Sequence, residues 1–512
     1  IQNEIQIGSI SAYAWLQDLY ETLKIQVSDD VANNVDIKFV LTAWSGPNQE
    51  YMSDPVEIVI NVKNSTLLYG LFNEDLTLYP NTEYLVSGNF VMNNNTTLTI
   101  MPGTILKVSD GVSIWIKGYI RAIGTYDNRI TFMPENNQWT GFIIRGGGMP
   151  GYWDSSTLAY TDYTAIFKYC NFSNVGYLFN TGYPTNESGL VEDSDIQSVG
   201  RMNSPSSSFY IRRSNIQYYS FSYGIEEDLH NSNIIHNTNV GNNGVVGNQY
   251  GYPTNIYENL GFHSNNIFNN EVYGGSAPTD SPFTNLRAIS TQSSNTDLYF
   301  TPNYYGTSNE IILDYNIVDY FDNNFLALAY YDNYLTQPNE QAHAIVWKVL
   351  VNGFDAQDEY ALMDPVGVGS HEFKVYFNRE MDTSVNPLIG YGVRIPYTQE
   401  ILIPENGSWS TDGKIYTVTH DIRIGAADGI NRISVRSARD LELFEIPKED
   451  SRFNFLLQSA GSASTGWYAT AGLGNIALTW EAPSAEEIDD ALGYNMYRYQ
   501  VDADGVESTP VK

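Results

Sequence analysis

Two arginines in the middle of the chain, Arg212 and Arg213, are the basic residues best placed for chemistry, because Glu226 follows them closely. A basic group held beside a carboxylate can remove a proton from a substrate while the developing charge is stabilised. The same three residues could equally form a surface salt-bridge cluster. We expect the salt-bridge arrangement, so the sequence predicts no catalytic residue, and these three remain the alternative.

The segment VEDSDI contains three acidic residues that could bind a cation or act as a pair: Glu192, Asp193 and Asp195. Paired carboxylates perform glycoside hydrolysis, and carboxylate oxygens are the ligands that Ca²⁺ prefers. Side chains alternate along a strand, so we expect Asp193 and Asp195 to project together from one side of it. The segment can be interpreted in three ways: as a Ca²⁺ site, as a pair of hydrolytic carboxylates, or as acidic side chains that are simply exposed to water. No cofactor other than Ca²⁺ is expected.

Tyrosine is abundant, with 39 residues, and two groups of tyrosines lie in the second half of the long central region. Aromatic faces stack on sugar C–H surfaces, while neighbouring Asn and Asp side chains can bind hydroxyl groups. The alternative is that these tyrosines only favour strand formation. The sequence thus predicts a glycan-binding surface at Tyr218, Tyr219, Tyr223, Tyr250, Tyr252 and Tyr257.

The formal net charge of −33 excludes several classes of partner. A field of this sign repels DNA and RNA and disfavours anionic membrane surfaces. No run of about 18 apolar residues occurs, so we expect no membrane insertion by this segment. Cys170 is the only cysteine, and its inward-facing position in AIFKYCNFSNVG, without a histidine near it in the sequence, predicts a small buried side chain rather than a nucleophile.

The elements that would position these residues follow a repeat in the sequence LTIMPGTILKVSDGVSIWIKGYIRAIGTYDNRITFMPENNQWTGFIIR. Short alternating segments begin near Leu98, Leu106 and Ile114, and again, 22, 24 and 28 residues later, near Ile120, Ile130 and Phe142. A chain that turns after every short strand and returns after about two dozen residues winds a coil. The spacing predicts strands of successive coils stacked on one another.

Later in the chain, an Asn or Asp is followed directly by an apolar residue in six recurring phrases, at Phe172, Ile196, Ile216, Ile234, Ile267 and Ile317. We expect the apolar member to fill the core. The neighbouring Asn residues are expected to take left-handed turns and to stack their amides between coils.

This pattern resembles the right-handed parallel β-helix repeat proteins of bacteria, most specifically in LTIMPGTILKV followed by IKGYIRAIGT. The resemblance covers about half of the chain. It implies an all-β fold, but the family includes polysaccharide lyases, hydrolases, phage tailspikes and non-catalytic surface proteins, so it leaves the function open. The aspartate signatures of the family's hydrolases are absent from this sequence.

Alternating apolar and polar residues in the regions on either side of the repeat predict strands of β-sandwiches. We expect a partial immunoglobulin-like (Ig-like) sandwich at 1–70, the parallel β-helix at 71–340 and a second Ig-like sandwich at 341–460. Residues 461–512 resemble the first half of a fibronectin type III domain, so we expect the natural chain to continue beyond Lys512. Strands of the second sandwich are predicted in AIVWKVLVNG, HEFKVYFNREM, IYTVTHDI, NRISVRSA and RFNFLLQSA.

These features together predict a secreted or bacterial cell-surface protein without catalytic activity, serving adhesion, glycan contact or scaffolding. The expected partner is a glycan or a surface protein, and nucleic acid is excluded. Two alternatives remain open from the sequence: a polysaccharide lyase or hydrolase acting on an extracellular glycan, and an accessory C-terminal region of a larger secreted enzyme.

Overall fold

The computed structural model contains 44 strands and one helix in the residues that it describes, so the protein is nearly all β, as the sequence predicts. The described residues are 35–42, 44–45, 51–52, 54–62, 65–145, 153–154, 159–160, 163–181, 188–197, 201–203, 208–217, 228–230, 232–235, 261–271, 286–291, 298–299, 302–357, 365–393, 400–423, 428–458, 465–472 and 475–481.

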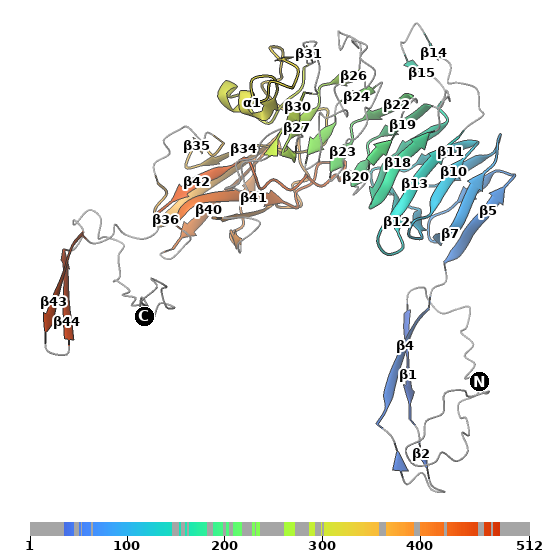
Figure 1. Ribbon diagram of the computed structural model, residues 1–512, viewed down its shortest axis with the longest axis horizontal. Coiled ribbons are helices and arrows are strands. Elements are labelled where there is room, and N and C mark those ends of the chain that lie inside the picture. Colours follow the sequence, from blue (N-terminus) through green and yellow to red (C-terminus); the bar gives the residue numbers. More distant parts are fainter. Residues whose placement is uncertain are drawn as a thin grey trace.

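Two long sheets make up the centre of the molecule, and every strand pair in them is parallel (Figure 1). The first has thirteen strands: β5 (Thr66–Phe72), β7 (Glu83–Met92), β9 (Ile105–Val108), β10 (Ser113–Ile116), β12 (Ile130–Pro134), β13 (Trp139–Ile144), β17 (Cys170–Ser173), β18 (Val175–Thr181), β20 (Asp195–Gln197), β21 (Arg201–Asn203), β23 (Asn215–Gln217), β25 (Asn233–Ile235) and β27 (Asn266–Phe268). The second has eight: β6 (Leu76–Leu78), β8 (Thr97–Ile100), β11 (Tyr119–Ile123), β16 (Ala165–Lys168), β19 (Ser188–Glu192), β22 (Ser208–Arg212), β24 (Asp228–His230) and β26 (Gly261–His263). We call these two sheets the parallel stack.

The pairing register matches two of the three predicted pairs of segments, and in the third Leu106 pairs with Phe132, two residues beyond Ile130. Leu98 is the partner of Ile120, and Ile114 is the partner of Phe142, each in parallel strands. A turn between neighbouring strands requires glycine at Gly118, because a Cβ there would lie 2.0 Å from the backbone oxygen of Thr96. The first strand of the stack, β5, starts before the predicted boundary at 71.

The buried residues of both long sheets form one hydrophobic cluster. Phe132 and Phe172, on neighbouring strands, stack with ring centroids 5.1 Å apart, and Phe167 of the other sheet meets Phe132 edge to face at 6.0 Å. Cys170 lies in this cluster with no exposed surface, which confirms its prediction as a small buried side chain. Burial also raises the pKa of its thiol well above the usual value.

The expected stacking of Asn amides between coils is present. Asn266 donates from Nδ2 to Oδ1 of Asn233 at 2.8 Å, and Asn233 donates in the same way to Asn215 at 2.7 Å. Asn215 in turn donates to Oδ1 of Asp195 at 2.8 Å. These residues form the amide ladder, which runs across four strands and satisfies polar groups that would be costly to bury unpaired.

Two antiparallel sheets follow the stack and share a second hydrophobic cluster; we call them the antiparallel unit. One sheet contains β34 (Val346–Val351), β35 (Phe354–Asp355), β36 (Gly369–Phe377), β39 (Ser408–Trp409) and β40 (Ile415–Ile422), and the other β37 (Leu388–Gly392), β38 (Ile401–Leu402), β41 (Gly429–Arg436) and β42 (Asn454–Leu457). Each of the five segments predicted to form strands in this region contains one.

The remaining described elements are short. Helix α1 (Glu310–Asn316) starts at Asn309, whose side chain accepts a hydrogen bond from the N–H of Ile311. The other strands form two-stranded sheets: β1 (Val35–Leu41) with β4 (Val56–Val62), β2 (Trp44–Ser45) with β3 (Tyr51–Met52), β14 (Trp153–Asp154) with β15 (Ala159–Tyr160), β28 (Asn270–Glu271) with β29 (Leu286–Arg287), β30 (Ile289–Ser290) with β32 (Ile317–Val318), β31 (Leu298–Tyr299) with β33 (Ala329–Tyr330), and β43 (Thr465–Gly472) with β44 (Asn475–Glu481). No helix in the described ranges is long and apolar enough to cross a membrane.

Candidate functional site

The residues predicted to bind glycans lie outside the described residues, as does Glu226. The predicted glycan surface therefore stays a prediction from the sequence.

Asp193 and Asp195 do not lie on one strand, contrary to the sequence prediction. Asp193 occupies the corner between β19 and β20, with a left-handed φ of 48°, and Arg213 occupies the equivalent corner of the next coil with a φ of 47°. The left-handed backbone changes the direction of the chain, so the alternation of side chains is broken at this point. The two corner residues are brought together instead, with Arg213 Nε 2.6 Å from Asp193 Oδ1.

The three acidic residues of VEDSDI contact three different cations. Glu192 pairs with Lys168, and Asp195 pairs with Arg129 at 2.6 Å. Asp193 pairs with Arg213, as above. The structure therefore does not bring these three carboxylates together around one point, and the Ca²⁺ site stays a prediction from the sequence.

Arg213 also reaches the antiparallel unit. Its second amino nitrogen lies 2.8 Å and 2.7 Å from the two carboxylate oxygens of Glu442. The side chains of Asp193 and Glu442 together raise the pKa of the guanidinium, against the effect of burial. Arg212 ends β22, and its carbonyl accepts a hydrogen bond from the backbone N–H of Asp193.

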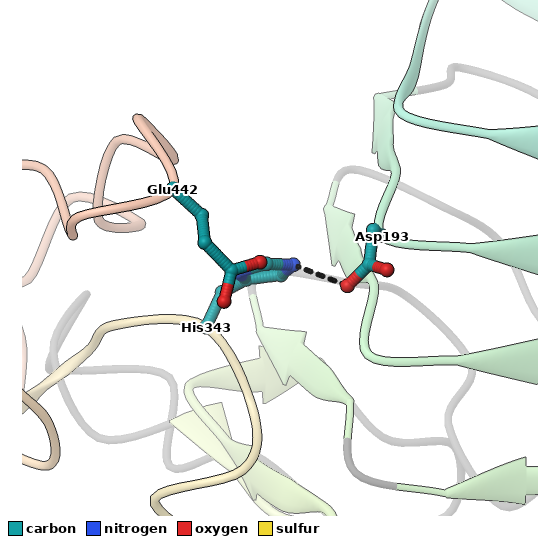
Figure 2. Close-up of side chains that lie close together, drawn as sticks. All are labelled: Asp193, His343 and Glu442. Carbon is teal, nitrogen blue, oxygen red and sulfur yellow. Dashed lines mark ion pairs between the residues drawn. The ribbon is translucent and has the colours of Figure 1, made fainter. Parts of the chain in front are cut away.

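His343 lies between carboxylates of both parts of the molecule and has no exposed surface. Its Nδ1 is 3.1 Å from Asp440 Oδ2, and its Nε2 is 3.5 Å from Asp193 Oδ1 (Figure 2). At that distance Nε2 makes no hydrogen bond of its own. Burial favours the neutral ring, but the two carboxylates outweigh it and raise the pKa of the imidazole.

The loop that carries Glu442 is fixed by Asp440. Oδ1 of Asp440 accepts hydrogen bonds from the N–H groups of Glu442 at 2.9 Å and Phe444 at 3.0 Å. The Phe444 ring stacks on His343 with centroids 3.4 Å apart, and the guanidinium of Arg129 lies 3.4 Å from the Phe444 centroid. A ring with a cation near it is a favourable arrangement when both are desolvated.

The cluster is balanced in charge. Carboxylates of Asp193, Asp440 and Glu442 face two arginines, because Arg379 also lies 2.9 Å from Glu442 and 3.5 Å from Asp440. Protonation of His343, which its raised pKa favours, adds the third positive charge. We call Asp193, Arg213, His343, Arg379, Asp440 and Glu442 the ionic joint, because it connects the parallel stack to the antiparallel unit.

A metal ion could use part of the same cluster. One ligand atom each of Asp193, His343 and Glu442 lies within 4.8 Å of the others (Figure 2). However, the guanidinium of Arg213 contacts both carboxylates, and Arg379 also pairs with Glu442, so their negative charges already face two cations. A divalent cation would have to displace Arg213 and would be repelled by it.

Sequence reasoning found Asp193 and Arg213 but missed His343, Asp440 and Glu442. The last three are more than a hundred residues away from Asp193 along the chain. Each occurs singly, without the spacing of a metal motif, so no local signal connects them to the acidic segment.

A cleft of about 500 Å³ lies beside the ionic joint, between the stack and the antiparallel unit. Its side on the stack includes Arg129, Ser173, Asp195, Gln197 and Gln217, and its side on the antiparallel unit includes Leu443, Glu445, Ile446 and Lys448. None of the sequence-based site predictions except Asp195 falls in this cleft.

Comparisons of the chain with family models, with curated proteins and with solved structures find no match. The residues and geometry of this chain are therefore the basis for a functional proposal.

Proposed function

We propose that the chain is part of a secreted or bacterial cell-surface protein that acts as a scaffold for adhesion or glycan contact and has no catalytic activity. In this proposal the parallel stack is a right-handed parallel β-helix, the antiparallel unit is an Ig-like sandwich, and residues 461–512 belong to a fibronectin type III-like domain. The uniform parallel pairing at intervals of about two dozen residues supports the β-helix.

The observation that carries the proposal is the position of Arg213. The alternative of a lyase needs a basic side chain beside a substrate, and Arg213 was the sequence's candidate together with Arg212. In the structure Arg213 is held by two carboxylates, one from each side of the joint, and their charge raises its pKa. A guanidinium in such contacts is suited to connecting two parts of a protein and unsuited to accepting a proton.

The tyrosine-rich sequence supports glycan contact. Tyr218, Tyr219, Tyr223, Tyr250, Tyr252 and Tyr257 supply aromatic faces that can stack on sugar C–H groups, and Asn and Asp residues near them in the sequence can bind hydroxyl groups.

A glycan array tests this function with the chain Ile1–Lys512. The expected result is binding of at least one glycan that is lost in the combined variant Tyr218→Ala, Tyr219→Ala and Tyr223→Ala. The control is Tyr126→Ala, because Tyr126 is 50% exposed on a distant part of the stack. Retained binding in the triple variant would contradict the proposed surface.

A uronate-lyase absorbance assay on the same glycans tests the alternative. We expect no activity. Activity that disappears in Arg213→Ala, but persists in Tyr126→Ala, would overturn the proposal of a non-catalytic scaffold.

A further inference from the structure

Two columns of outward-facing side chains run side by side across β17, β20 and β23. The first contains Asn171, Asp195 and Asn215, and the second contains Ser173, Gln197 and Gln217, each at equivalent positions of successive coils. Because the members of a column repeat with the strand spacing of about 4.8 Å, each column presents polar groups at regular intervals.

The two columns differ in how their polar groups are used. In the first column, Asn215 donates to Asp195, and Arg129 contacts both Asp195 at 2.6 Å and Asn171 at 3.3 Å. In the second column, the carboxamides of Gln197 and Gln217 make no hydrogen bond to the described part of the chain. Gln217 is only 7% exposed, and both glutamines line the cleft.

A carboxamide with no partner among the described residues is free to bind a group that enters the cleft. A carboxamide carries two donor hydrogens and an acceptor oxygen, which is the combination that a hydroxyl group matches as both acceptor and donor. Two such groups, one coil apart, are therefore suited to a ligand with hydroxyl groups repeated along its length.

The opposite wall and the charges narrow the class of ligand. Leu443 and Ile446 of the antiparallel unit supply an apolar wall on which sugar C–H groups can lie. The two basic residues of the cleft are already paired, Arg129 with Asp195 and Lys448 with Asp450 at 2.8 Å, and the cleft is also lined by the carboxylate of Glu445. With a net charge of −33 on the whole chain, an acidic polymer would be repelled.

An extended peptide fits the cleft less well. Peptides bind to sheets mainly by adding a strand to a free edge. Here β17, β20 and β23 each have a neighbouring strand on both sides, so their backbone groups are already paired. The groups that the cleft offers are side-chain amides, which can bind hydroxyl groups without the addition of a strand.

We propose that the cleft between the parallel stack and the antiparallel unit binds a neutral oligosaccharide, with Gln197 and Gln217 holding its hydroxyl groups. The volume of about 500 Å³ lies within the range of small-ligand sites. The proposal rests on the proposed function in taking an extracellular glycan as ligand, but the residues that line its site include none of the predicted tyrosines. Since Leu443 directly follows Glu442, the cleft also depends on the ionic joint for one of its walls.

The test uses the chain Ile1–Lys512 and an array of neutral oligosaccharides, followed by calorimetry with the oligosaccharide that gives the highest signal. We expect Gln197→Ala and Gln217→Ala each to weaken binding roughly fivefold, the loss typical of one net hydrogen bond. Gln458→Ala is the matched control, because Gln458 is exposed at the end of the antiparallel unit. Gln197 is also exposed, so its variant should fold, and a thermal unfolding midpoint checks this for every variant.

The outcomes separate this proposal from the proposed function. Binding that is lost in the tyrosine variant but unchanged in both glutamine variants overturns the cleft and leaves the scaffold function standing. Binding weakened by the glutamine variants alone supports the cleft and contradicts the tyrosine surface. Absence of any neutral-oligosaccharide binding, or binding of peptides or acidic glycans only, overturns the cleft proposal.

Discussion

Arg213 of the parallel stack and Glu442 of the antiparallel unit face each other with both carboxylate oxygens within 2.8 Å of one guanidinium nitrogen. The same guanidinium contacts Asp193 through Nε at 2.6 Å. One arginine therefore holds a corner of the stack and a loop of the antiparallel unit. Arginine suits this role because its planar donors can serve two carboxylates at once.

Replacing Arg213 by methionine should destabilise the protein. The change keeps part of the side chain's volume but leaves Asp193 and Glu442 facing each other without their shared cation. We expect a loss of about 2 kcal/mol in the free energy of unfolding, a value below that of fully buried pairs because Arg213 is partly exposed. Urea denaturation measures it. Arg423→Met, at an exposed position, should change stability by less than about 0.5 kcal/mol, and an equal loss in both variants would contradict the joint.

His343 should make stability depend on pH. The pKa of His343 is raised in the folded protein. Protonated His343 therefore contributes fully to the free energy of unfolding below the imidazole pKa of the unfolded chain, about 6.5, and this contribution is lost as the pH rises through the folded pKa. The two carboxylates that face His343, Asp193 and Asp440, have lowered pKa values in the folded protein. Their contribution to the free energy of unfolding is therefore lost only in acid. Arg213, which contacts Asp193, has a raised pKa and stays charged over this range.

Thermal unfolding measured from about pH 5 to about pH 9 tests this, since the range spans the unfolded imidazole value. We expect the midpoint to fall as the pH rises above the folded pKa of His343. His343→Gln should flatten this part of the curve, whereas His371→Gln should keep it. An unchanged curve in His343→Gln would show that another group is responsible.

The amide ladder should be sensitive to the loss of a single member. Asn233 donates to Asn215 and to the carbonyl of His343, and it accepts from Asn266. Asn233→Leu would leave those buried partners unsatisfied, and we expect a cost of about 3 kcal/mol in unfolding free energy. Asn94→Leu, at an exposed turn, is the control, and equal effects of the two changes on denaturation would argue against the ladder.

Removal of divalent metal should leave the protein unchanged. Arg213 and Arg379 contact the carboxylates of the ionic joint, and protonation of His343 completes its charge balance without a metal ion. We expect the same thermal midpoint with and without EDTA. A midpoint that rises with added Ca²⁺, and no longer rises in Asp195→Asn, would instead support the Ca²⁺ site predicted from the sequence.

Cys170 should react with a thiol reagent only after unfolding. Its side chain has no exposed surface, and burial raises its pKa well above the usual value, so the reactive thiolate is suppressed. Spectrophotometric titration with a disulfide reagent should show almost no thiol in the native protein and one thiol per chain in denaturant. Rapid reaction of the native protein would place Cys170 outside the core.

Local patterns were enough to predict much of the fold. The pairing of Leu98 with Ile120 and of Ile114 with Phe142 follows from the spacing of alternating apolar segments. The amide ladder follows from Asn residues that recur beside core isoleucines. In both cases each coil repeats the same short pattern, so the partner of a residue is its equivalent in the next coil.

The ionic joint and the cleft could not be predicted in this way. Asp193 was expected to share a strand with Asp195, but Asp193 lies at a corner with a left-handed backbone instead. It forms an ion pair with Arg213. The partners from the antiparallel unit are beyond the reach of any local pattern, because no repeat relates them to the stack.

The sequence by itself determined the strands, the parallel repeat and the polar columns along it, because these depend on residues that are close in the chain or one coil apart. Only the tertiary structure decided which charges meet at Arg213 and His343 and which glutamines stay free in the cleft. These contacts depend on how the antiparallel unit lies against the stack, and that arrangement is set by the shapes and charges of two surfaces that are distant in sequence.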